Sequence, residues 1–298
     1  MADHERQAGS MITKPGVYEL PEDDYHADPV PDGSLSCSWA KQIARPGGPA
    51  KWRWEHDHPR PPRKEFDLGH AAHQLVLGVG APIARIPYAE WRSNAAKAAV
   101  AEARDAGAIP LKPAEYEQVT LMAAQIERHR LASSLLAEAL RHEASAFRPD
   151  ERTGTWLRCR FDSIGDRGTV DYKTTISADP TEFVRQAMRL GYHQQAAWYR
   201  DMAMALDLTD GPFRFIAQEK TAPYLVAVIE LDADTEDLGR TLNQRAIDTF
   251  ATCVATDTWP GYPEIIHRVS APTWAYQTEE LDTDTEQELL ALLKGNAS

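Results

Sequence analysis

The sequence predicts an α/β (α+β) domain with a central mixed sheet flanked by helices. Apolar side chains recur at helical spacing over about 93–142, whereas apolar and polar side chains alternate over 156–163 and 169–173. The alternating segments predict two hairpin strands, because residues 165–168 (GDRG) between them have the composition of a turn. This order of helix-rich and strand-rich segments is typical of a sheet covered by helices.

The other elements are predicted from chain breakers and periodicity. Pro- and Gly-rich stretches at 46–49 and 58–62 interrupt the early chain, and a helix is predicted over 66–77. After the hairpin we expect a helix over about 181–206, strands near 213–218 and 224–231, and a helix over about 235–252. We expect a flexible N-terminus (1–15), one domain (16–277) with the helical segment 93–142 inserted, and an acidic tail (278–298).

Composition excludes several classes of protein. The chain has 298 residues, with 32 Lys and Arg against 45 Asp and Glu, and a formal net charge of −13. A protein that coats DNA through bulk positive charge is therefore excluded. Three cysteines cannot supply the four thiolates of an iron–sulfur cluster, and none is expected. Without a signal-peptide core or a bilayer-length apolar run, we expect a cytoplasmic protein with no membrane role.

The hairpin predicts which side chains meet. With residues 165–168 as the loop, Asp162 faces Asp171, and Arg160 faces Lys173. The period of two places Asp171 and Lys173 on one face of their strand, and Asp162 on the same face of its own strand as Arg160. The alternate positions point toward a core: Leu157, Cys159, Phe161, Val170 and Tyr172.

Two carboxylates that face each other repel, and a divalent cation would relieve the conflict. Oxygen ligands without cysteine suit Mg²⁺ or Mn²⁺, which take phosphate oxygens and waters as further ligands. Lys173 would lie beside that ion, where it could orient or deprotonate the attacking water. The chemistry implied is metal-assisted phosphodiester hydrolysis. The alternative is a solvated hairpin face, since most charged side chains are exposed.

Two helical features could belong to the same site. His73 follows Gly69 by one helical turn, and the missing side chain of Gly69 would leave space beside the imidazole. Gln195 and Tyr199 are four residues apart and share a helix face. The alternatives are an ordinary surface histidine and a packing pair.

Four segments in this order carry a family resemblance: 68–73 (LGHAAH), 160–162 (RFD), 170–175 (VDYKTT) and 192–199 (YHQQAAWY). They resemble the ordered motifs of the PD-(D/E)xK nuclease superfamily, and more narrowly the exonuclease VIII (RecE-like) and RecB-type phage recombination nucleases. The similarity runs from about residue 16 to 276. Phe161 stands where the family usually has proline, and Asp171 where many restriction enzymes have glutamate.

The resemblance implies a role for each site residue. His73, Asp162 and Asp171 would be metal ligands, and Glu143 matches a carboxylate that relatives place upstream of the first Asp. Lys173 would be the catalytic lysine. Gln195 and Tyr199 would form the Q-x-x-x-Y motif at the rim of the active site.

A basic segment precedes these motifs. From Lys41 to Lys64 there are seven Lys and Arg against two acids, with tryptophans interleaved that could stack on bases. Serines at the predicted start of a helix could hold a phosphate. The expected DNA contacts are Ser36, Ser38, Lys41, Arg45, Lys51, Trp52, Arg53 and Arg160. The alternative is a solvated basic segment with its tryptophans in the core.

The resemblance implies a Mg²⁺-dependent double-strand DNA exonuclease, with Mn²⁺ as a substitute, that resects linear ends 5′ to 3′ and leaves 3′ single strands. Its partner would be a RecT-like single-strand annealing protein, and it would assemble as a homo-tetramer. As a phage or prophage protein, it would be located in the cytoplasm of the bacterial host. The alternatives are an endonuclease or single-strand nuclease on the same core, or a catalytically silent module that binds DNA ends.

Overall fold

The computed structural model describes residues 11–58 and 67–273 of the chain. One compact unit ends at Gly261 and a second begins at Tyr262, and the described residues 262–272 of the second form no helix or strand. The central sheet and the helices packed on it belong to the first unit. The predicted flexible N-terminus lies mostly, and the predicted acidic tail entirely, outside the described residues. The domain boundaries stay a prediction.

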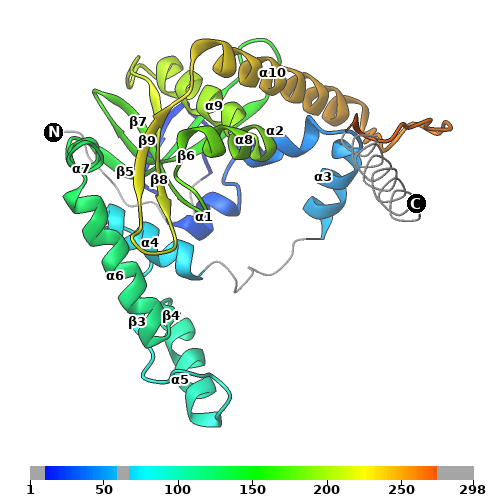
Figure 1. Cartoon of the computed structure of the whole chain (residues 1–298). Helices are drawn as coiled ribbons and strands as arrows, with labels where there is room; N and C mark the ends of the chain where they lie inside the picture. The colour runs from blue at the N-terminus through cyan, green and yellow to red at the C-terminus, as the bar shows by residue number, and fades with distance from the viewer. Residues whose placement is uncertain (1–10, 59–66, 274–298) are drawn as a thin grey trace, which may run out of the picture. The chain divides into compact units, whose positions relative to one another are not determined.

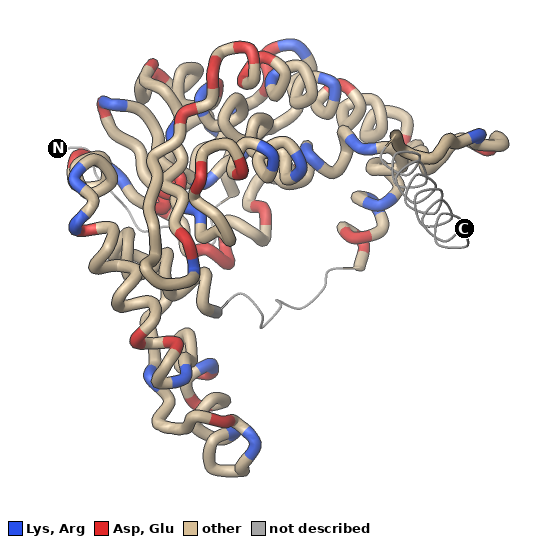
Figure 2. Tube along the Cα trace, in the orientation of Figure 1, with Lys and Arg blue, Asp and Glu red and all other residues tan. Residues whose placement is uncertain are grey.

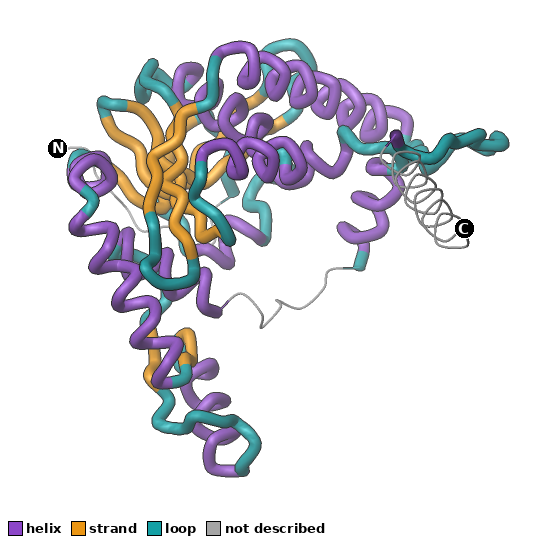
Figure 3. The backbone as a smooth tube through the Cα atoms, in the orientation of Figure 1, coloured by secondary structure: helices purple, strands orange, loops and turns teal. Residues whose placement is uncertain are grey.

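Helices and strands alternate along the first unit (Figures 1 and 3). The helices are α1 (Glu22–His26), α2 (Cys37–Ile43), α3 (Gly48–Asp57), α4 (Asp67–Leu77), α5 (Asn94–Asp105), α6 (Pro113–Arg128), α7 (Arg130–Ala137), α8 (Pro180–Leu190), α9 (Tyr192–Ala205) and α10 (Ala233–Thr256). The strands are β1 (Gly16–Tyr18), β2 (Leu35–Ser36), β3 (Ile83–Arg85), β4 (Ile109–Leu111), β5 (Arg141–Pro149), β6 (Trp156–Gly165), β7 (Gly168–Thr175), β8 (Phe213–Glu219) and β9 (Val226–Glu230).

Within the described residues, seven strands form one mixed sheet in the order β1-β5-β6-β7-β8-β9, with β2 also paired to β6. The β2–β6 and β7–β8 pairs are parallel, and the other pairs are antiparallel. Strands β3 and β4 form a small parallel sheet of their own. The central mixed sheet flanked by helices is therefore confirmed.

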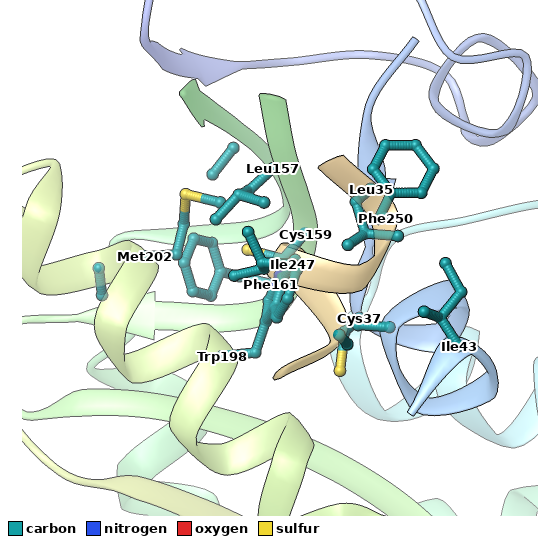
Figure 4. Packing of buried hydrophobic residues seen from close by; sticks show 14 of the residues in the cluster. Leu35, Cys37, Ile43, Leu157, Cys159, Phe161, Trp198, Met202, Ile247 and Phe250 are labelled. Atoms are coloured by element: carbon teal, nitrogen blue, oxygen red, sulfur yellow. The ribbon is translucent and has the colours of Figure 1, made fainter. Parts of the chain in front are cut away.

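Helices cover both faces of the sheet (Figure 1). On one face, α2, α9 and α10 bury their apolar sides against β5 and β6, where Trp198 and Phe250 share a core with Leu157, Cys159 and Phe161 (Figure 4). On the other face, α4, α6 and α7 pack against Val170 and Tyr172 of β7. Both sides of the hairpin are thus buried, which gives its few polar side chains fixed positions.

The predicted hairpin register is confirmed where the two strands pair. Ser163 pairs with Val170, and Gly165 with Gly168, so the loop is only Asp166 and Arg167. Gly168 has φ 110°, and a Cβ on it would lie 2.1 Å from the carbonyl oxygen of Pro212, so glycine is required.

Beyond these pairs the strands separate. β7 pairs in parallel with β8, whereas β6 pairs with β5 and, at Leu157 and Arg158, with β2. The predicted pairing of Arg160 with Lys173 is therefore wrong: Arg160 pairs with Ser145 of β5, and Lys173 with Ala217 of β8. The separation opens the sheet beside Asp162 and Asp171.

Two predicted helical segments differ from the structure. The segment 93–142 contains α5, α6 and α7 but also β4 and the start of β5. The helix predicted over 181–206 is broken at Gly191, whose φ of 70° ends α8 and begins α9. The break matters for the site, because α9 carries Gln195 and Tyr199.

Candidate active site

An open cleft of about 1270 Å³ lies where β6 and β7 separate. Side chains from both hairpin strands reach it, and so do side chains from α4, β5 and α9. The site residues predicted from the sequence that line it are Ser38, His73, Glu143, Arg160, Asp162, Lys173 and Tyr199.

Three of the predicted metal ligands form a compact group. His73 Nε2 lies 2.9 Å from Asp162 Oδ2, and His73 Nδ1 lies 3.3 Å from Glu143 Oε1. One ligand atom from each residue falls within 4.8 Å of the other two. Gly69 lies in the cleft wall beside them, but a Cβ on it would meet only Thr174 Oγ1 at 3.9 Å. The contacts of His73 with Glu143 and Asp162 therefore do not depend on the absence of a side chain at Gly69.

The backbone at Glu143 places this carboxylate in the group. The β5–β6 ladder pairs His142 with Ser163 and Ala144 with Phe161, and skips the Glu143–Asp162 pair between them. Glu143 has φ 51°, a conformation uncommon for residues other than glycine. Non-glycine residues in this region are found preferentially at functional sites, where the surroundings hold them. Arg160 Nε also holds the Glu143 carboxylate.

The group forms an ion-paired cluster at neutral pH. Burial disfavours the imidazolium, but the carboxylates of Asp162 and then Glu143 outweigh it and raise the pKa of His73 to about 9. Burial likewise opposes ionisation of Asp162, and the charge and hydrogen bond of His73 outweigh it and lower the pKa of that carboxyl. The backbone N–H of Tyr172 also donates to Asp162 Oδ2, over 2.9 Å.

Asp171 lies outside that three-residue group, in an adjacent buried network. Only 2% of it is exposed. Lys173 Nζ is 2.7 Å from Asp171 Oδ2, and Gln195 Nε2 donates to Asp171 Oδ1 over 2.6 Å. Burial raises the pKa of Asp171 to about 6, although Lys173 opposes the shift. Burial disfavours the ammonium of Lys173, but the charges of Asp171 and Asp162 outweigh it and raise the pKa of Lys173. Lys173 is therefore a charged donor at neutral pH.

Tyr199 closes the site from α9. Its ring packs edge-on against Phe161 and Phe213, with centroids 5.5 and 5.7 Å away, and burial raises the pKa of its hydroxyl well above the ordinary value. Gln195, through its bond to Asp171, and Tyr199, in the cleft wall, therefore both lie beside the site, where the family resemblance puts them.

The predicted DNA contacts fall into three groups. Ser38, Lys41 and Arg160 lie in or beside the cleft, whereas Arg45, just after α2, and Lys51 and Arg53, on α3, are exposed. Ser36 is buried and caps α2, its hydroxyl accepting from the N–H of Trp39 over 3.3 Å. The last three basic residues of the segment, Arg60, Arg63 and Lys64, lie outside the described residues. Figure 2 shows basic and acidic residues interspersed along the chain.

The Trp52 side chain is buried among other side chains and is not exposed for stacking on a base. It is 6% exposed, and its ring is stacked against His56 on one side and Trp259 on another, with centroids 4.8 and 4.6 Å away. This packing favours the core alternative for Trp52.

Several cleft residues have no sequence signal that singles them out. Glu22, Asp23 and His26 of α1 line the cleft, as do Gln186 and Lys220. They are brought there by tertiary packing from distant parts of the chain. His70 and Tyr192 also line the cleft, and they do have a signal, because they belong to the motif segments 68–73 and 192–199.

Comparison with known proteins agrees with this geometry. The model of the PDDEXK-like domain of unknown function (DUF3799) matches residues 36–272. The chain belongs to this family. The crystal structure of a "Putative exonuclease" from Eubacterium rectale aligns with the DUF3799 chain with a TM-score of 0.58 and 14% identity, over 85% of this chain and 96% of that one. At 14% identity, the structural similarity is evidence for the fold alone. No curated protein matches the chain.

The DUF3799 site fits a divalent cation. PDDEXK nucleases depend on such ions, and His73, Glu143 and Asp162 supply one imidazole and two carboxylates whose ligand atoms lie within 4.8 Å of one another. These donors suit Mg²⁺ or Mn²⁺ better than a soft metal. The family and the fold thus support a nuclease. No helix among the described residues is long and apolar enough to cross a membrane.

Proposed function

We propose that this DUF3799 protein is a Mg²⁺-dependent double-strand DNA exonuclease that resects 5′ to 3′ and leaves 3′ single strands for recombination. One observation carries the nuclease chemistry: the His73, Glu143 and Asp162 donors lie beside the buried Asp171–Lys173 pair in one open cleft. The "Putative exonuclease" of similar fold supports the choice of exonuclease.

The residues divide the work of hydrolysis. A bound Mg²⁺ would lower the pKa of a coordinated water and neutralise charge on the phosphate. His73, Glu143 and Asp162 would hold the ion, and Asp171 would be a further carboxylate ligand. Lys173, charged through its pairing with Asp171, would donate to the attacking water or a phosphate oxygen rather than remove a proton. Tyr199 shapes the rim.

DNA would enter the cleft along its basic wall. Ser38 and Arg160 line the cleft, and Arg45, Lys51 and Arg53 are exposed on the segment that follows α2. These residues suit phosphate contacts, which supply affinity without sequence preference. Glu22 and Asp23 also line the cleft, and their charges would repel a DNA backbone on that part of the wall. A RecT-like annealing protein, a homo-tetramer and a phage or prophage setting in the bacterial cytoplasm belong to the same proposal.

The test compares linear duplexes, with and without a 5′-phosphate, and covalently closed circles, in Mg²⁺ or EDTA. We expect Mg²⁺-dependent loss of linear DNA, faster with the 5′-phosphate, and intact circles. Cutting of circles would favour the endonuclease alternative. Binding of ends without any cleavage would favour the silent module. Lys173→Ala should abolish hydrolysis while the far-UV circular dichroism stays that of the wild type.

A further inference from the structure

A second lysine reaches the buried carboxylate network from the N-terminal part of the chain. Lys41 is half-buried on α2, and its Nζ lies 3.5 Å from Gln195 Oε1. Its ammonium also lies 5.6 Å from the centroid of the Tyr192 ring, while Lys173 Nζ lies 5.4 Å from the same centroid. Lys41 is therefore part of the site wall and not of the exposed basic surface.

Gly191 makes this approach of Lys41 possible. A Cβ on Gly191 would lie 3.2 and 3.3 Å from the Cδ and Cγ atoms of Lys41, so the lysine stem passes where other residues carry a side chain. Gly191 also has φ 70°, the break between α8 and α9. Gly191 thus both forms the break before α9 and leaves room for the Lys41 side chain beside it.

The three polar groups form a directed chain. An ammonium can only donate hydrogen bonds, and an ionised carboxylate can only accept them. A glutamine amide donates through its NH₂ group and accepts through its oxygen. Between Lys41 and Asp171, the Gln195 amide satisfies both neighbours in one orientation, with Oε1 toward Lys41 and Nε2 toward Asp171. Without the ammonium, the orientation with Nε2 turned away costs less, and in that orientation Asp171 keeps Lys173 but loses the Gln195 donor.

We propose that Lys41 is a positioning residue of the nuclease site: it fixes the Gln195 amide so that this amide donates to Asp171 and holds the carboxylate opposite Lys173. This inference rests on the proposed function for its kinetic consequence. It differs from the role that the basic segment implies, in which Lys41 contacts a DNA phosphate. Burial lowers the pKa of Lys41, because the ammonium loses hydration where it lies. This agrees with a lysine held inside the site rather than on the surface.

A double-mutant cycle separates the two roles. Lys41→Met keeps the aliphatic stem, Gln195→Met removes the amide, and exposed Lys97 on α5 provides the matched control Lys97→Met. We expect Lys41→Met to lower kcat about tenfold, the scale for losing a partner that orients an active-site group. KM and its salt dependence should stay unchanged, Lys41→Arg should recover most of kcat, and Lys41→Met should have no further effect in the Gln195→Met protein.

Two kinetic outcomes would overturn the proposal. A raised KM, with a salt slope reduced by about one phosphate contact, would make Lys41 a DNA ligand. If the fold-loss of kcat in the Lys41→Met, Gln195→Met double variant equals the product of the two single-variant losses, Lys41 does not act through Gln195.

A second measurement does not depend on cleavage. In protein labelled with ¹⁵N-glutamine, the Gln195 side-chain NH₂ signals are assigned by their loss in Gln195→Met. We expect Lys41→Met to shift these signals and Lys97→Met to leave them in place. If the wild type cuts no DNA and the signals still shift, the proposed function fails and the contact stands. If Lys41→Met leaves the signals unmoved, the positioning role is refuted.

Discussion

Replacing Glu143 by glutamine removes one carboxylate charge from the His73, Glu143 and Asp162 group and keeps the size of the side chain. Asp162→Asn does the same to the other carboxylate. The two carboxylates differ in their partners: Arg160 already pairs with Glu143, whereas Asp162 is held by His73 and the Tyr172 N–H. The two substitutions should therefore weaken metal binding to different extents.

The distances set the size of each effect. The donor atoms lie within 4.8 Å of one another. A cation among these donors lies closer to each carboxylate than the donors lie to one another. The interaction of unit charges about 5 Å apart at an effective dielectric constant of about 20, about 3 kcal/mol or about two orders of magnitude in Kd, is therefore a lower bound. Asp162→Asn should show at least this loss. Glu143→Gln should show a still larger loss, because Arg160, which Glu143 neutralises in the wild type, would be left as an unpaired positive charge beside the ion.

The assay is a Mn²⁺ titration of DNA-free protein followed by electron paramagnetic resonance, with unfolding midpoints to confirm that each variant folds. An unchanged Kd in Glu143→Gln would show that Glu143 is not a ligand. A smaller loss in Glu143→Gln than in Asp162→Asn would refute the argument that Arg160 is left as an unpaired charge beside the ion.

Further predictions concern pH, packing and the tryptophans. The pKa of His73 is raised from 6.5 to about 9, so the stability that its imidazolium adds to the metal-free protein is complete below pH 6.5 and is lost as the pH rises through about 9. The urea midpoint measured in EDTA should therefore fall between pH 6.5 and about 9. A midpoint that does not change with pH would contradict this prediction. For the same reason Mn²⁺ binding at pH 7.5 should release a proton, seen as a calorimetric heat that depends on the buffer, and equal heats in all buffers would exclude an imidazolium. Gly239→Ala should destabilise the fold by about 2–3 kcal/mol or more, since its Cβ would lie 2.1 Å from the His193 carbonyl oxygen, whereas Gly69→Ala should be neutral or stabilising; equal urea midpoints for the two would refute this. Trp52→Ala should cost about 3–5 kcal/mol of unfolding free energy and leave the DNA affinity of the folded protein unchanged, and a weaker Kd with normal stability would restore Trp52 as a DNA contact.

The sequence was most informative where the signal is local. The turn at Asp166 and Arg167 fixes the register of the hairpin, so the pairing of Ser163 with Val170 could be predicted. Asp171 and Lys173 could be grouped because they are two residues apart on one strand, whereas the grouping of His73 with Asp162 came from the family resemblance.

Where partners are distant in the chain, the sequence was less informative. Arg160 was matched to Lys173 because nothing local shows that β7 leaves β6 for β8. The strands β1 and β2 have only three and two residues, too short for a period-two pattern to show. Glu22 and Asp23 reach the cleft only through the packing of α1, so the acidity of that segment cannot be placed from composition.

The cleft draws its side chains from α4, β5, β6, β7 and α9, with β8 needed to hold β7 in place. His73 is therefore made early in synthesis, whereas Asp171, Lys173 and Gln195 are made much later. A chain interrupted before α9 lacks Gln195, and one interrupted before β7 also lacks the Asp171–Lys173 pair. Under the proposed function, translation products that stop before β7 cannot cut the DNA of the cell that makes them.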